Sequence, residues 1–117
     1  MIEKIRIVHY DEIITESSSS FRKGRTILMP LVSSTPMLRA ARQGKYAVAA
    51  FNVHTLEMLQ AVVEAAVETE SPLILQTTVG TVKHLGEDYI AAAAKTAADR
   101  SGIPIALDLD HCTDFDL

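Results

Sequence analysis

The sequence has a single cysteine, no tryptophan and no long apolar run, and each shortage narrows the possibilities. One cysteine among 117 residues excludes an internal disulfide framework and fits a reducing cytosol. No apolar stretch approaches the ~18 residues that a membrane span needs, and the first residues lack the basic-then-apolar pattern of a secretory signal. We therefore expect a cytoplasmic protein without a membrane partner.

Positive charge and phosphate-binding glycine motifs are scarce as well. The formal net charge is −4, which argues against a nucleic-acid partner or an anionic membrane partner. No Gly-x-Gly-x-x-Gly turn follows the first predicted strand, and no Walker-type Gly-Lys-Ser/Thr loop is present. These absences count against a dinucleotide-binding fold and against a P-loop nucleotidase.

Composition divides the chain near residue 28. Residues 1–28 carry five Lys/Arg and four Asp/Glu, a net charge of +1, whereas residues 29–117 carry six and eleven, a net charge of −5. A serine run over 17–20, followed by basic residues, is typical of a flexible linker. We predict that residues 1–28 are a flexible or non-native N-terminal extension and that residues 29–117 form one folded domain.

From residue 35 onward, helix and strand patterns alternate. Thr35 and Pro36 suit the N-cap and first position of a helix that Gly44 closes with a positive φ. The apolar run over 46–51 predicts a strand buried on both faces. Further along we expect the following segments: a helix from the Thr55 cap to Ser71, a strand over 73–77, a turn over 78–81 with a looser segment to Gly86, a helix from Glu87 or Asp88 to Arg100, and a strand from Ile103.

This alternation predicts an α/β fold with a parallel sheet. Successive strands are spaced by about 30 residues, close to the spacing in an eight-fold barrel. Each predicted strand ends in polar residues, and in parallel sheets ligands gather at the carboxyl ends of the strands. We expect the three polar exits to form one rim, with His54 and His84 as rim or surface histidines.

The third predicted strand ends in an acid next to an imidazole. Side chains alternate along a strand, so Asp108 and Asp110 should share one face. The opposite face, packed on helices, should carry Ile105, Leu107 and Leu109. His111 lies where the strand stops, so the following turn decides where its ring points.

Two interpretations of Asp110 and His111 remain open from the residues alone. A neutral imidazole is a common zinc ligand, and a neighbouring carboxylate suits general acid/base chemistry. Alternatively, Asp110 or Asp114 caps the next helix and His111 is a loop residue. Carboxylates at both Asp108 and Asp110, closing an apolar strand, favour a functional site more than a lone Asp-His pair does.

Four motifs resemble a known family: Gly44-Lys-Tyr-Ala-Val-Ala-Ala-Phe-Asn52, Ser71-Pro-Leu-Ile-Leu-Gln76, Gly80-Thr-Val-Lys-His84 and Leu107-Asp-Leu-Asp-His111. Through them, residues 29–117 resemble the N-terminal third of class II ketose-bisphosphate aldolases. Residues 53–57, His84 and residues 111–116 look most like the tagatose-1,6-bisphosphate branch. The resemblance implies about three βα units of a TIM (β/α)8 barrel. It also implies zinc-dependent, reversible cleavage of tagatose or fructose 1,6-bisphosphate to glycerone phosphate and glyceraldehyde 3-phosphate.

The resemblance also implies roles for individual residues. His111 matches a zinc ligand, and Asp110 matches the acid/base that takes the proton from the C4 hydroxyl. Asn52 and Thr78 match substrate contacts at the first and second strand exits. The implied cofactor is zinc, acting as a Lewis acid on the ketose oxygens. The implied partner is a phosphorylated ketose, and the family is typically homo-oligomeric.

Departures from the family pattern leave three hypotheses. Asp108 stands where the family usually has His, and Thr55 where Asn is frequent. A catalytic zinc needs about three protein ligands, and the family's other histidines come from later strands. We therefore expect a fragment of a zinc aldolase that is inactive in isolation. The alternatives are a truncated, non-catalytic assembly or regulatory subunit of an aldolase complex, and a small doubly wound binding domain without metal.

Overall fold

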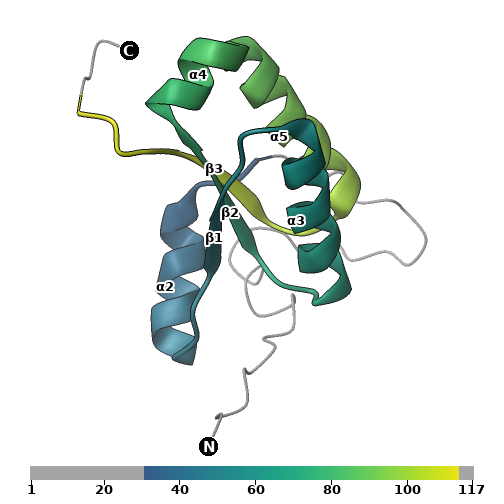
Figure 1. Ribbon diagram of the computed structural model, residues 1–117. Coiled ribbons are helices and arrows are strands. Elements are labelled where there is room, and N and C mark those ends of the chain that lie inside the picture. Colours follow the sequence, from purple (N-terminus) through teal and green to yellow (C-terminus); the bar gives the residue numbers. More distant parts are fainter. Residues whose placement is uncertain (1–30, 114–117) are drawn as a thin grey trace, which may run out of the picture.

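The computed structural model describes residues 31–113 as a three-stranded parallel sheet with helices on both faces (Figure 1). The strands are β1 (Ala49–Asn52), β2 (Leu73–Thr78) and β3 (Ile105–Asp110), in the order β1-β2-β3. The helices are α2 (Ser34–Gly44), α3 (Leu56–Glu68), α4 (Val79–Leu85) and α5 (Glu87–Ser101). The predicted α/β alternation and parallel sheet are confirmed. The predicted extension over 1–28 and the possible cap Asp114 lie outside the described residues.

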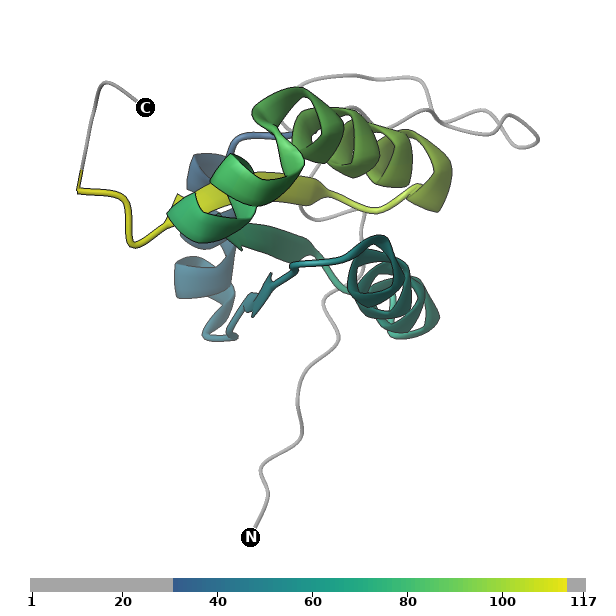
Figure 2. The same cartoon turned by 45° about the horizontal axis from the view of Figure 1, so that its top comes forward.

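The larger hydrophobic core lies between one face of the sheet and helices α3 and α5, which pack side by side (Figure 2). Leu75 of the central strand and Ile105 of β3 are fully buried there. Ala94 and Ala98 line the buried stripe of α5. Their small side chains let the helix backbone approach the sheet closely, so this alanine-rich helix is positioned by packing.

The opposite face of the sheet is covered by α2 only near the amino ends of the strands. Met37 of α2 packs on Ile74 and Ala106, the second residues of β2 and β3. The backbone N–H of Val32 donates to the carbonyl of Ile105 at 2.9 Å, which ties the segment before α2 to β3. We call this side of the sheet the α2 face. Its carboxyl end extends past the residues that α2 covers.

Two helix ends differ from the prediction. The N-cap of α2 is Ser33, not Thr35, because the Ser33 hydroxyl accepts the Thr35 N–H at 3.3 Å. The residue with positive φ that ends α2 is Lys45, at 56°, not Gly44. Gly44 has a different requirement: a Cβ there would lie 2.8 Å from the ring of Tyr46. The glycine therefore makes room for an aromatic side chain.

The prediction of a turn and a loose segment after β2 was wrong, because these residues form helix α4. Thr78 caps the helix by accepting the N–H of Thr81 at 3.3 Å, and Gly86, with φ 91°, separates it from α5. Seven residues that include Gly80 carry too little periodic signal to predict a helix. Contacts of α4 with α5 and β2 supply the stabilisation that local propensity lacks.

Two burial expectations were also wrong. All four residues of β1 are exposed, although the apolar run predicted burial on both faces. Leu109, expected against helices, is 37% exposed. β1 is an edge strand of the sheet that residues 31–113 form, with a neighbouring strand on one side only. Leu109 does face α4 and α5, where it lines a hollow with Val82, Ile90 and Ala91, but the helices do not cover it fully.

No helix within residues 31–113 combines the length and the apolar character required to cross a bilayer.

The central strand should dominate stability. We expect Leu75→Ala to lower the free energy of unfolding by roughly 2–5 kcal/mol, because it leaves a cavity in a fully buried position. The matched variant Leu109→Ala, at the exposed edge, should cost about 1 kcal/mol or less. Urea unfolding followed by far-UV circular dichroism measures both. Equal losses would contradict the packing of the sheet on α3 and α5.

The start of α3 makes a pH-dependent contribution. The Glu57 carboxylate accepts one hydrogen bond from the backbone N–H of Glu57 itself and a second from the Thr55 hydroxyl. Both hydrogen bonds lower the pKa of Glu57. Because the folded pKa lies below the unfolded value, this stabilisation is present above the unfolded pKa and is lost as pH falls through the folded one. Thr55→Val should raise the pKa of Glu57 in an NMR titration. The control Thr69→Val, at the other end of α3, should leave that titration unchanged.

Candidate functional site

The candidate site is the carboxyl end of the α2 face, beyond the residues that α2 covers (Figure 1). Ile74 and Ala106 mark this face, and the residues two and four positions later along each strand point the same way. The parallel register places Asn52, Gln76 and Asp108 at one level and Thr78 and Asp110 at the next. The predicted polar rim therefore exists, and its side chains come from all three strands.

Asn52 and Asp110, both predicted site residues, are in direct contact. The Asn52 Nδ2 donates to Asp110 Oδ2 at 3.3 Å, across 58 residues of sequence. The two strands that carry them are not neighbours, since β2 lies between β1 and β3. The side chain of Asp110 is 25% exposed, so it faces the rim while remaining accessible.

A second amide–carboxylate pair lies beside the first. The Gln76 Nε2 donates to Asp108 Oδ2 at 3.1 Å, between neighbouring strands. Gln76 was not predicted as a site residue. The available signal was its spacing of two from Ile74 in an otherwise apolar strand, which places an amide on the same face as the predicted acids.

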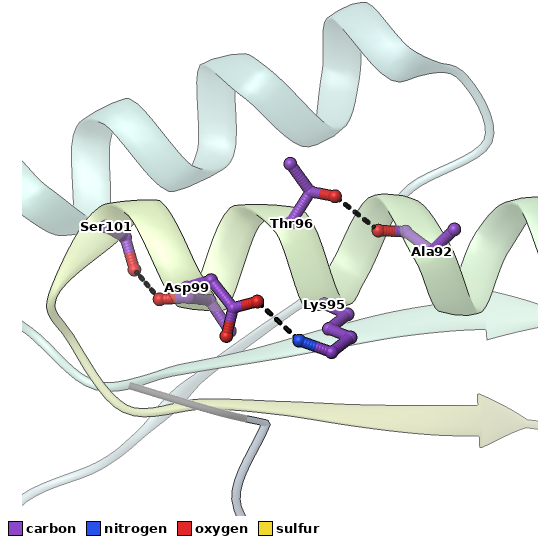
Figure 3. Close-up of polar contacts among 6 residues, drawn as sticks. Ala92, Lys95, Thr96, Asp99 and Ser101 are labelled. Atoms are coloured by element: carbon purple, nitrogen blue, oxygen red, sulfur yellow. Dashed lines mark hydrogen bonds and ion pairs between the residues drawn. The ribbon is translucent and has the colours of Figure 1, made fainter. Parts of the chain in front are cut away.

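These two amides satisfy the carboxylates without neutralising them. Asn and Gln side chains are uncharged donors, so neither amide brings a positive charge to Asp108 or Asp110. Among residues 31–113, the ion pair between a lysine and a carboxylate joins Lys95 to Asp99 on α5 (Figure 3). This helix covers the opposite face of the sheet, so the pair lies away from the rim. The rim is therefore an acidic surface suited to a cation.

His111 follows the strand in a left-handed conformation, with φ 56°. Its ring is 87% exposed, and Nε2 lies 3.8 Å from Asp110 Oδ2. That separation is beyond hydrogen-bond range. The two side chains form an ion pair only when the ring is protonated. The turn thus keeps the imidazole next to the acid but leaves it accessible to other groups.

The donors at this rim fit part of a zinc site. A neutral imidazole and carboxylates are ordinary zinc ligands, but a catalytic site needs about three protein ligands. Residues 31–113 contain no group of three or more His, Cys, Asp or Glu side chains arranged to hold a metal ion. The chemistry of the donors fits zinc, and their number falls short.

Thr78 lies on the same face but interacts with a different set of residues. Its Oγ1 is 3.1 Å from Thr81 Oγ1, which in turn is 2.6 Å from His54 Nδ1. Thr78 lies opposite Asp110 in the strand register, but its hydrogen bonds go to Thr81. Thr81 was missed because its segment was predicted to be a turn.

Comparison with known proteins identifies relatives of this arrangement. Residues 32–117 match the family model for class II fructose-bisphosphate aldolases. A protein of Coccidioides immitis assigned as a fructose-1,6-bisphosphate aldolase superimposes with a TM-score of 0.62 at 30% identity, over 68% of this chain. The fructose-bisphosphate aldolase of Campylobacter jejuni gives a TM-score of 0.62 at 26% identity, over 74% of this chain. The matches span 30% and 29% of those two chains.

The pairing of the Gln76 amide with the Asp108 carboxylate predicts how a charge at position 76 changes stability. We expect Gln76→Glu to lower the free energy of unfolding by about 0.2–1 kcal/mol at neutral pH, because like charges then face each other across neighbouring strands. The control is the same substitution in an Asp108→Asn background, which should have a smaller effect because the facing charge is absent. Urea unfolding at low and high salt separates the two, since salt screens the repulsion. A loss at Gln76 that does not respond to salt would contradict this account.

Proposed function

This chain belongs to the class II fructose-bisphosphate aldolase family, and we propose that it supplies the first three strand–helix units of a barrel that cleaves a ketose 1,6-bisphosphate. The products are glycerone phosphate and glyceraldehyde 3-phosphate, and the reaction is reversible. The observation that carries the proposal is the hydrogen bond from Asn52 to Asp110. It brings a carboxylate and an amide from non-adjacent strands to one rim, beside His111.

Asp110 has the chemistry of the base in the cleavage direction. Its carboxylate takes the proton of the C4 hydroxyl, the C4–O bond becomes a carbonyl, and the electron pair of the C3–C4 bond passes to C3. The Asn52 amide holds one carboxylate oxygen and leaves the other open to the substrate. In the reverse direction the protonated acid returns the proton to the new hydroxyl.

His111 is the residue of this chain that we assign to zinc. Zinc, when bound, supplies Lewis-acid stabilisation of the charge that develops on the C2 and C3 oxygens. The exposure of the ring suits ligation by Nε2 together with ligands from later strands. Asn52 and Thr78 are assigned to the substrate, and Asp108 adds a second negative charge on the same face.

Tagatose 1,6-bisphosphate is the substrate that we favour within this class. The support is the sequence of residues 53–57 and 111–113, which lies at the exits of β1 and β3 beside the proposed base. Tagatose and fructose bisphosphates differ in configuration at C4, the carbon whose hydroxyl Asp110 would deprotonate. We also propose a cytoplasmic location and a homo-oligomeric assembly.

A second candidate function is a non-catalytic subunit that stabilises an aldolase assembly. It is favoured by the exposed edge strand β1, whose four residues all face solvent in this chain. This function needs the sheet edges of the chain and does not need Asp110.

A coupled assay for triose phosphate release separates the two functions. The isolated chain should show no turnover, because residues 31–113 lack a complete set of metal ligands. Co-expression with the remaining part of a class II barrel should give zinc-dependent activity with tagatose 1,6-bisphosphate above that with the fructose isomer. Asp110→Asn in this assembly should lower kcat by about 10²–10⁴-fold.

Asp99→Asn, on α5, is the matched control and should leave activity unchanged. Turnover by the isolated chain would contradict the incomplete site. An assembly that stays active with Asp110→Asn would contradict the assigned base and favour the subunit function.

A further inference from the structure

We propose that His54 is a positioning residue for Thr78. Through the Thr81 hydroxyl, the His54 ring sets the direction of a short hydrogen-bond chain, so that the Thr78 hydroxyl proton points to the rim as a donor. This inference rests on the proposed function for its ligand class, which is an acceptor oxygen of a phosphorylated sugar. It assigns a role to two residues, His54 and Thr81, that the proposed mechanism does not use.

The chain of contacts is continuous and links two strand exits. His54 follows β1, Thr78 ends β2, and Thr81 lies in the first turn of α4 between them. The separations are 2.6 Å from His54 Nδ1 to Thr81 Oγ1 and 3.1 Å from Thr81 Oγ1 to Thr78 Oγ1. Thr81 is only 8% exposed, so protein groups satisfy its hydroxyl.

Two directions use the Thr81 proton within the chain of contacts. A third, in which Thr81 accepts from both neighbours, leaves the proton of this nearly buried hydroxyl without an acceptor among these three residues. If His54 Nδ1 carries a proton, it donates to Thr81, and Thr81 donates to Thr78. Thr78 Oγ1 then accepts both the hydroxyl and the N–H of Thr81, and its own proton is left for the rim. If Nδ1 carries no proton, it accepts from the Thr81 hydroxyl, and Thr81 in turn accepts from Thr78. The Thr78 proton is then not available to the rim.

The surroundings of Thr78 favour the first direction. Thr78 lies level with Asp110 in the strand register, on a face that carries a second carboxylate at Asp108. That face is rich in acceptor oxygens, and a phosphorylated sugar adds more of them. A donor at Thr78 complements both, whereas an acceptor there would face other acceptors without a proton between them.

The nitrogen signals of His54 test the direction in the 117-residue chain. With ¹⁵N-labelled histidine, and at a pH where the ring is neutral, we expect the proton on Nδ1 and the bare nitrogen at Nε2. Thr81→Val, which removes the hydroxyl and keeps the shape, should release the ring to a mixture of tautomers. Thr81→Ser should restore the wild-type signals. A bare Nδ1 in the wild-type chain, or no response to Thr81→Val, would overturn the proposal.

Two controls exclude a general loss of structure. Thr96→Val removes a hydroxyl that donates within α5 to the carbonyl of Ala92, and it should leave the His54 signals unchanged (Figure 3). The signals of His84, in the last turn of α4, report whether that helix persists in Thr81→Val.

Kinetics in the co-expressed assembly provide a separate measurement. Thr81→Val and His54→Phe should raise KM for the ketose bisphosphate by roughly tenfold with kcat little changed, because a hydrogen bond to bound substrate is lost. Thr81→Ser should restore KM. An unchanged KM would overturn the positioning role. An assembly inactive in every form would instead contradict the proposed function, and the nitrogen signals would still decide the direction of the chain.

Discussion

The parallel pairing of β2 with both of its neighbours is the constraint on which the candidate site depends. Register brings Asn52, Gln76 and Asp108 to one level although 56 residues of numbering separate the first from the last. Without it, the amides of Asn52 and Gln76 would have no carboxylates to bind. The rigidity of the site is therefore that of the buried strand beneath it, where Leu73, Leu75 and Ile105 pack on α3 and α5.

The electrostatics of the rim follow from the same arrangement. Two carboxylates on one face, each bound by a neutral amide, concentrate negative charge without cancelling it. The exposed ring of His111 adds a nitrogen of the kind that zinc prefers beside these carboxylates. The described residues thus bring carboxylates, amides and an imidazole to one rim, and these donors fit part of a zinc site.

The two faces of the sheet explain why the fold is incomplete at its edges. The face toward α3 and α5 is a packed core, whereas the α2 face is covered only at its amino end. β1 and Leu109 are exposed because strands and helices that flank such units in a barrel are not part of residues 31–113. Open strand edges of this kind favour pairing with further chain.

The sequence by itself determined the alternation of elements, the parallel sheet and the meeting of polar strand exits, since these follow from apolar periodicity and short connections. It also placed Asp108 and Asp110 on one face through simple alternation. Only the tertiary structure decided which groups these acids contact, because the sequence of a single strand does not specify its register with a neighbouring strand. Helix α4 and the contact of His54 with Thr81 depend on packing between segments that are distant in the sequence, so local patterns did not predict them.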